Sequence, residues 1–397
     1  LWGPFWWTVS RDVEYSEHGP VIRQEHGTYA VRYAGMGEVG NLDQRLAMNK
    51  AGSLEEWLAA MAMQALPSIN YIYADADGNI ALLYNGQMPK RVEGFDWQEY
   101  LPGDRSDLIW REYLPFEHVP LLLNPKAGFI TEANSTPFRA TAPEDDLKPE
   151  DFSATLGIET RMTNRAFRAL ELLGSDTSIT AEEFRAYKYD HAYSTESELA
   201  SLIAEVLAVE AGSDEDLKQA QNILRDWDLR TDYESRGAAL GVLMGEPVVR
   251  ARLGGKEPPA PLDSLQEAIA HLKEHFGRLD PMWGEVNRII RGGVDMPIQG
   301  GPDILRAVYG RKADEDGRLG AEGGDTYIMF VEWDEDGAVT SESIHQFGSA
   351  TIDETSSHFA DQAPLFAEEK TTPVLLDWDA FEPTIAESYR PGGRAAR

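Results

Sequence analysis

Strand-like patterns dominate the first part of the chain. Residues 1–34 predict two strands joined by a turn. The segments Ile69–Ala74 and Ile80–Tyr84 are rich in aromatic and β-branched residues, and Asp77-Gly78 between them is a strong turn signal. These two segments therefore predict a β-hairpin, and residues 92–112 after them predict a loop.

Helical periodicity replaces this pattern twice. Residues 41–66 predict helix, and Ser53 followed by two glutamates is a suitable N-cap within it. From 158 to 310 the pattern is mostly helical, with a flexible break at 250–263, where Gly and Pro pairs occur. The helices expected in this block are Arg161–Leu173, Ala181–Lys188, Glu196–Glu210, Ser213–Asp226 and Leu265–Phe276.

Strands return towards the end of the chain. Residues 325–334 and 338–347 predict a second hairpin, with its turn at Asp336-Gly337. Two strands need further sheet partners for stability, and the early strands are the nearest candidates. The order of sheet, helical block and sheet therefore predicts an α+β fold, in which a helical excursion interrupts one sheet system.

The net charge of the chain limits the classes of partner that it is expected to bind. Lys and Arg number 36 against 68 Asp and Glu, which gives a net charge of −32. Nucleic acids and anionic membranes are bound by basic surfaces, so neither is expected as a partner. The chain has 397 residues, of which 42% are hydrophobic, so it can bury a large core. No apolar run approaches the length of a membrane span.

Two further absences in the sequence limit its chemistry. No cysteine occurs, which excludes disulfides, thiol catalysis and cysteine-based zinc sites. The opening residues LWGPFWWTVS lack the features of a signal peptide and do not begin with Met. They read like the middle of a longer chain, with an aromatic strand already under way.

The most informative stretch for chemistry is residues 113–138. It predicts a short strand at Phe129–Thr131, followed by the polar turn Asn134-Ser135-Thr136-Pro137. An Asn at the end of a strand can hold a fixed N–H donor in a pocket, which is one half of an oxyanion hole. Taken alone, these four residues are ordinary turn chemistry.

Histidines offer a competing site. His271 and His275 fit an H-x-x-E-H zinc pattern on a helix, although the helix also reads as simply amphipathic. His18, His345 and His358 are single histidines near strands and read as structural. No G-x-S-x-G elbow, Walker loop or helix-opening G-x-G-x-x-G occurs, which disfavours serine-elbow hydrolases, P-loop NTPases and Rossmann enzymes.

Several motifs in a fixed order carry a resemblance to a known family. Besides residues 113–138, they are LPSINYIYAD at 66–75, DGNI at 77–80, GQMPKR at 86–91, GIETR at 157–161, WGEVNR at 283–288, GGDTY at 323–327 and HQFGSA at 345–350. In this order they resemble the rear part of the large subunit of the penicillin acylase family. These are N-terminal-nucleophile amidohydrolases, and they include the acyl-homoserine-lactone acylases.

The resemblance implies a fold and its divisions. The family fold is the αββα sandwich of the Ntn-hydrolases, here with a helical insertion and incomplete because the N-terminal part is missing. Residues 1–142 would form the first part of the sandwich core, 143–310 the mostly helical insertion, and 311–397 the strands that return to the core. The three segments would form one fold unit.

The resemblance also implies catalytic residues. Asn134 matches the family's oxyanion Asn, whose side-chain amide donates to the oxyanion. The family often has a second Asn where this chain has Ser135, so the register could differ by one residue. Arg161 or Arg165 would hold the site, because the family motif fits either residue. The alternative is that both are surface arginines at helix positions i and i+4, without a role in the site.

Substrate and metal contacts follow from the same comparison. Ser68 and Ile69 lie where the family lines its acyl pocket, although a buried core residue is the simpler interpretation of Ile69. Asp146 matches a loop in which some members bind calcium. One Asp is far short of the six to eight oxygens that calcium takes, so a solvated acidic loop is the alternative.

The implied function is hydrolysis of the amide of an N-acylated small molecule, such as an acyl-homoserine lactone or a penicillin-like compound. The nucleophile would be an N-terminal Ser that is not in this chain and is freed by self-cleavage of a precursor, so this part alone would not catalyse. Expected partners are the small subunit and the front of the large subunit, and the expected location is periplasmic or secreted. The alternatives are a non-catalytic scaffold with the same fold and a zinc hydrolase built on His271 and His275.

Overall fold

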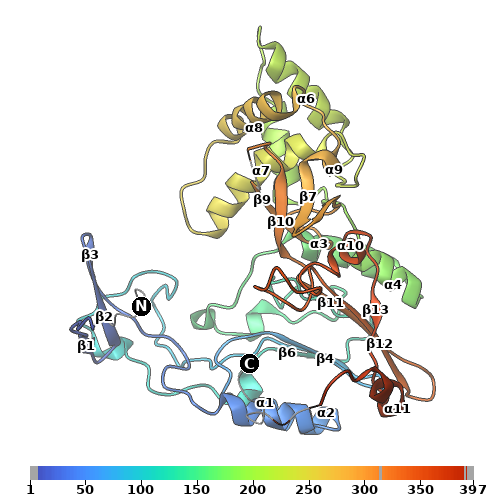
Figure 1. Ribbon diagram of the computed structural model, residues 1–397. Coiled ribbons are helices and arrows are strands. Elements are labelled where there is room, and N and C mark those ends of the chain that lie inside the picture. Colours follow the sequence, from blue (N-terminus) through green and yellow to red (C-terminus); the bar gives the residue numbers. More distant parts are fainter. Residues whose placement is uncertain (1–7, 313–314, 389, 391–397) are drawn as a thin grey trace. The chain divides into compact units, whose positions relative to one another are not determined.

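The computed structural model describes residues 8–312, 315–388 and 390 (Figure 1). Its contacts divide the chain into two compact units, Leu1–Arg161 and Met162–Arg397. Helix and strand occur in both. Among the described residues, no helix combines the length and the apolar character that crossing a membrane requires.

The first unit holds two small antiparallel sheets and a helix pair. The predicted hairpin forms as β4 and β5. Near the start, where two strands were predicted, three form as β1 to β3, and residues 1–7 of that prediction lie outside the described residues. The bounds are β1 Tyr15–Ser16, β2 Gly19–Gln24, β3 Gly27–Ala30, α1 Asn41–Lys50, α2 Leu54–Met61, β4 Tyr71–Ala74, β5 Ile80–Leu83 and β6 Leu121–Leu123. Short 3₁₀ turns lie at Ser106–Leu108, Phe116–His118, Pro149–Asp151 and Ala154–Leu156.

Capping divides the helical region at 41–66 into two helices. The Ser53 hydroxyl accepts a hydrogen bond from the Glu56 N–H at 3.2 Å, as predicted for an N-cap, so α2 begins at Leu54 and α1 ends before it. One face of α2 buries Trp57 and Met61 against Leu83 of β5. The sheet β4-β5-β6 therefore packs on α2.

Two buried amides fix the chain between α2 and β4. The fully buried Gln44 on α1 accepts hydrogen bonds from the N–H groups of Ala65 and Leu66 at 2.7 and 3.0 Å. The buried Asn85 side chain donates to the Leu66 carbonyl at 3.0 Å, and the backbone carbonyl of Asn85 accepts from the Ile69 N–H. Because buried polar groups are costly when unpaired, these bonds hold the chain from Ala65 to Ile69 in one conformation.

The strand predicted at Phe129–Thr131 is wrong. The strand lies earlier, at Leu121–Leu123, where it pairs with β5. Asn124 and Gly128 then adopt positive φ angles of 47° and 75°, which turn the chain away from the sheet. Beyond the turn, the Thr131 N–H donates to the Ala140 carbonyl, which ties the segment to the following loop and not to β5.

The second unit combines a helical cluster with two sheets. Its helices are α3 Asn164–Ser175, α4 Ala181–Lys188, α5 Glu198–Leu207, α6 Glu215–Asp226, α7 Ala238–Leu253, α8 Pro261–Phe276, α9 Trp283–Val286, α10 Ala363–Ala367 and α11 Trp378–Phe381, with a 3₁₀ turn at Glu382–Thr384. Its strands are β7 Asn287–Arg291, β8 Val294–Pro297, β9 Val308–Lys312, β10 Leu319–Gly324, β11 Tyr327–Trp333, β12 Val339–His345 and β13 Thr372–Pro373.

The second hairpin pairs differently from the expectation. Strands β11 and β12 form with the predicted turn, but β12 pairs next with β13, and the described residues show no pairing between them and the early strands. A separate sheet has the order β8-β7-β10-β9, with β7 and β10 parallel. Strands β7, β8 and β9 of this sheet lie within residues 287–312, where mostly helix was expected.

Helix α7 is absent from the helices that the sequence pattern predicted. It contacts α5, α6 and α8, and Figure 1 shows it among α6 and α8. Its residues are apolar nearly all round, so no polar face marks it, and it contains Gly241, Gly245 and Pro247. The helix continues to Leu253, so the predicted break at 250–263 begins too early.

Glycines on α7 allow Trp227 to pack directly against the helix backbone. A Cβ at Gly241 would lie 2.2 Å from Cζ3 of Trp227, and a Cβ at Gly237, the residue before the helix, would lie 2.4 Å from the same side chain. Trp227 is 8% exposed and donates from Nε1 to the Arg230 carbonyl at 2.7 Å. The indole of Trp227 therefore cannot move away from a side chain introduced at Gly237 or Gly241.

A charged cluster joins the start of this unit to its end. His191, 6% exposed, lies with Nδ1 at 2.8 Å from Asp232 Oδ1 and with Nε2 at 2.7 Å from Glu369 Oε1. A neutral imidazole has one N–H, so two carboxylate partners favour the imidazolium form. Burial alone would lower the pKa of His191, but the hydrogen bonds and charges of Glu369 and Asp232 outweigh it and raise the pKa.

We expect Gly241→Ala to lower the free energy of unfolding by about 1–3 kcal/mol, because the new methyl group overpacks the core against Trp227. Urea unfolding of the variant measures this loss. Gly293→Ala is the matched control, since a Cβ there meets nothing within 4 Å. Equal stability of the two variants would contradict the packing described.

We expect His191→Gln to change the pH dependence of stability. A raised His pKa gives a contribution that is full below the unfolded value of about 6.5 and is lost as pH rises through the folded pKa. The difference in unfolding free energy between wild type and variant should therefore shrink above pH 6.5, by up to about 1.4 kcal/mol per unit. Urea unfolding between pH 6 and 9 measures it, and a constant difference would contradict the assignment.

Candidate active site

The turn that holds Asn134 has a fixed backbone. Asn134 adopts a left-handed φ of 54°, a conformation that costs most residues energy and that Asn tolerates. It is exposed, while Ala133 before it and Ser135 and Thr136 after it are buried. The turn therefore presents the Asn134 side chain at the surface from a buried backbone.

Glu132 connects this turn to a second segment. Its Oε1 accepts a hydrogen bond from the Asn134 N–H at 2.7 Å and another from Asn70 Nδ2 at 3.4 Å. Asn70 directly follows Ser68 and Ile69, the residues predicted for the acyl pocket. One carboxylate oxygen thus brings two of the predicted parts of the site together.

The same turn is held from its other side by Arg161. The Thr136 N–H donates to the Arg161 carbonyl at 3.0 Å. The Arg161 N–H in turn donates to Glu159 Oε1 at 2.7 Å, and the Glu159 N–H donates to the hydroxyl of Tyr84 next to β5. The backbone of Arg161 is therefore next to the Asn134 turn, and its guanidinium is exposed.

Arg165 lies in the other unit, in the first turn of α3. Thr163 caps that helix by accepting from the Ala166 N–H at 3.2 Å, so α3 begins at Asn164, three residues later than predicted. Arg161 therefore precedes the helix, and the alternative of a helical i, i+4 pair is wrong. The Arg165 Nε donates to Asp303 Oδ1 at 3.2 Å.

Ser68 and Ile69 are more exposed than a core interpretation allows. Ile69 precedes β4 and is 49% exposed, so the expectation of a buried core residue is wrong. Ser68 is exposed and forms an isolated bridge with Gly86. Their role in an acyl pocket stays a prediction, with a backbone that Gln44 and Asn85 hold in place.

Asp146 organises its own loop. Its Oδ1 accepts hydrogen bonds from the N–H groups of Ala140 and Thr141 at 2.8 and 3.1 Å. Burial raises the pKa of Asp146, against the opposing effect of these two amides. Among the described residues, no group of three or more His, Cys, Asp or Glu side chains is placed to hold a metal ion. The residues around Asp146 alone do not fit calcium.

His271 and His275 make structural contacts. His271 is 9% exposed, and its Nε2 lies 2.8 Å from the Gly317 carbonyl, as expected for a hydrogen-bonded core residue. The His275 ring lies against it, with centroids 4.7 Å apart. Neither belongs to a group of potential metal ligands in the described ranges, so the zinc hypothesis has no support.

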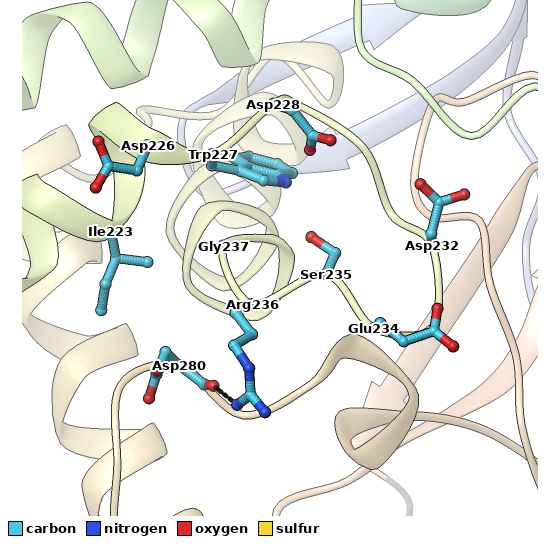
Figure 2. Close-up of a pocket in the computed structure, with 10 residues that line it drawn as sticks. All are labelled: Ile223, Asp226, Trp227, Asp228, Asp232, Glu234, Ser235, Arg236, Gly237 and Asp280. Carbon is cyan, nitrogen blue, oxygen red and sulfur yellow. Dashed lines mark hydrogen bonds between the residues drawn. The ribbon is translucent and has the colours of Figure 1, made fainter.

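A separate pocket lies in the second unit, between the end of α6, the start of α7 and the segment after α8 (Figure 2). Acidic side chains dominate its lining, and Arg236 Nη1 donates to the Asp280 carbonyl at 3.0 Å. None of the residues predicted for catalysis lines it. It adds nothing to the site around Asn134.

Sequence reasoning missed Glu132 and Asn70. Asn70 lies within the motif at 66–75, of which only Ser68 and Ile69 were predicted to contribute to the site. Side chains that accept from the backbone N–H two residues later are most often Asp or Asn in turns. A Glu in this role gives no recognisable signal.

Comparisons with known proteins agree on one family. The sequence profile of the family described as Penicillin amidase matches residues 6–383. The Penicillin G acylase of Escherichia coli is 36% identical over 138 residues, which cover 33% of this chain and 16% of that protein. The Acyl-homoserine lactone acylase PvdQ of Pseudomonas fluorescens (strain Pf0-1) is 22% identical over 421 aligned positions, which cover 91% of this chain and 52% of that protein.

A solved structure supports the fold. The thermostable Penicillin G acylase of Alcaligenes faecalis aligns with a TM-score of 0.60 and 16% sequence identity, over 97% of this chain and 79% of that one. At this identity the match concerns the fold alone. The chain thus spans about half the length of the curated relative that it matches along most of its own length.

We expect Asp146→Ala to destabilise the first unit by about 1–3 kcal/mol, because two backbone N–H groups lose their acceptor. Asp146→Asn keeps an acceptor and should cost much less. Thermal unfolding of both variants and wild type, with calcium and with a chelator, measures this. If calcium binds at Asp146, the chelator lowers the melting temperature of the wild type, and Asp146→Asn lowers the melting temperature as much as Asp146→Ala does.

Proposed function

Because the chain belongs to the penicillin amidase family, we propose that it forms part of an enzyme that hydrolyses the amide bond of an N-acylated small molecule. The observation that carries this proposal is the turn at Asn134, whose left-handed backbone is bonded on one side to Glu132 and on the other to Arg161. A side chain presented from so fixed a backbone suits an oxyanion donor, which stabilises a transition state only when it is oriented beforehand.

The proposed reaction has two steps. An N-terminal Ser outside this sequence attacks the amide carbonyl, its own α-amine takes the hydroxyl proton, and a tetrahedral oxyanion forms. The Asn134 amide donates a hydrogen bond to that oxyanion. The C–N bond then breaks, the amine leaves with the proton, and an acyl ester remains on the Ser. Water hydrolyses the ester by the same route and releases the acid.

Arg161 is the better of the two arginines for this site. Its backbone carbonyl is bonded to the Asn134 turn, and its side chain is exposed. A guanidinium stays charged at any working pH, so it would add positive potential without titrating. Arg165 is instead paired with Asp303, whose negative charge offsets the positive potential that Arg165 could supply.

An acyl-homoserine lactone or a similar fatty amide is the proposed substrate. The relative that aligns with 91% of the chain is named for acyl-homoserine lactones, whereas the one named for penicillin G aligns with 33%. Ser68 and Ile69 would contact the acyl chain, because exposed Ile69 offers an apolar surface beside Asn70 and Glu132. A penicillin-like substrate is the second candidate.

Further parts of the proposal come from the family resemblance. They are an αββα sandwich, maturation by self-cleavage of a precursor, a small subunit and the front of the large subunit as partners, and a periplasmic or secreted location. Calcium at Asp146 would need most of its ligands from outside the described residues. A non-catalytic scaffold with the same fold is the alternative, and the family comparison does not favour it.

We expect Asn134→Ala in the full-length gene product to lower kcat about 10²- to 10³-fold with little change in KM, because the lost donor acts mainly on the transition state. Release of the fatty acid from an N-acyl-homoserine lactone measures kcat. The matched control is Asn222→Ala on α6, where the side chain bonds Arg225 on the helix surface. Full activity in the Asn134 variant, with the protein folded, would reject this site.

A further inference from the structure

We propose that Glu132 is a positioning residue that holds Asn134 in the orientation needed to donate to the oxyanion. This inference rests on the proposed function, in which the Asn134 amide is the donor. Glu132 itself contacts no reacting atom in this scheme. It acts through the backbone of Asn134, which its Oε1 bonds at 2.7 Å.

The backbone of Asn134 explains why a support is needed. A left-handed φ of 54° is less favourable than the extended or right-handed conformation for any residue with a Cβ. Without a bond to its N–H, residue 134 can relax to a more common φ. The peptide plane would then rotate, and the side-chain amide would move with it.

The rest of the turn supports this conclusion. Residues after Asn134 are held at Thr136, whose N–H donates to the Arg161 carbonyl, and Ser135 and Thr136 are buried. Before Asn134, the Thr131 N–H donates to the Ala140 carbonyl, and the Glu132 carboxylate accepts from the Asn134 N–H itself. Glu132 thus supports the turn from its N-terminal side, and the Arg161 carbonyl supports it from its C-terminal side.

The second bond of Glu132 fixes the carboxylate itself. Asn70 Nδ2 donates to the same Oε1 at 3.4 Å, from a segment whose backbone is held by the buried side chains of Gln44 and Asn85. The carboxylate is therefore tied to the core of the unit and not only to its own turn. Loss of Asn70 should weaken, but not remove, the support.

The charge of Glu132 is not what the proposed role requires. A negative carboxylate near a developing oxyanion opposes it electrostatically, whereas the bond to Asn134 needs only an acceptor at the right distance. Glutamine places a neutral acceptor at the same length. Aspartate keeps the charge but is shorter by one methylene group, so it cannot place the acceptor in the same position.

These differences define the experiment, carried out on the full-length enzyme with an N-acyl-homoserine lactone as substrate. We expect Glu132→Asp and Glu132→Ala to lower kcat about 10- to 100-fold with KM nearly unchanged, as expected for a displaced donor. Glu132→Gln should stay within about threefold of wild type, and Asn70→Ala should show a smaller loss than Glu132→Ala. Thermal unfolding of each variant establishes that it is folded.

A double-mutant cycle separates positioning from a general structural effect. If Glu132 acts through Asn134, the Glu132→Ala/Asn134→Ala variant is no slower than Asn134→Ala alone. Multiplied losses in the double variant, or a Gln variant as slow as the Ala variant, would overturn the inference. If Asn134→Ala alone has wild-type activity, the proposed function of the site fails first, which is a distinct result.

Discussion

The geometry of the first unit depends on two amide side chains that are buried away from water. The Gln44 and Asn85 side chains pair with the backbone of Ala65 and Leu66, and the backbone carbonyl of Asn85 accepts from the Ile69 N–H. An unpaired N–H or carbonyl there would cost about 1–3 kcal/mol, so these bonds select one path for the chain. Asn70 emerges from that path and contacts Glu132, which in turn contacts Asn134. The candidate site is thus the outer end of a polar chain that begins in the core.

Local signals allowed much of the secondary structure to be predicted. The hairpins at Asp77-Gly78 and Asp336-Gly337 formed, and α4 has the predicted bounds, because turn glycines and the capping Thr180 act over a few residues. Helix α7 could not be found in this way, since its sequence is apolar nearly all round and shows no polar stripe. Pairing of β12 with β13 joins residues about thirty positions apart, and nothing local specifies it.

The candidate site was predictable only in part. The residues Asn134 and Arg161 came from the order of motifs, and their backbones lie next to each other through the bond to Thr136. Glu132 and Asn70 could not be inferred, because their role depends on a contact across 62 positions of sequence. The burial of Ile69 was misjudged because an apolar residue next to a strand resembles a core residue, although the chain there runs along the surface.

The contact between Trp227 and the glycines at 237 and 241 has a consequence for how this protein can change over time. The indole occupies the space that any side chain at 241 would need, so the two positions cannot vary independently. A larger residue at 241 requires a smaller one at 227, and the first of the two changes carries the full steric penalty. The second unit therefore constrains its own evolution at this point. Related chains should either keep the pair or exchange both members together.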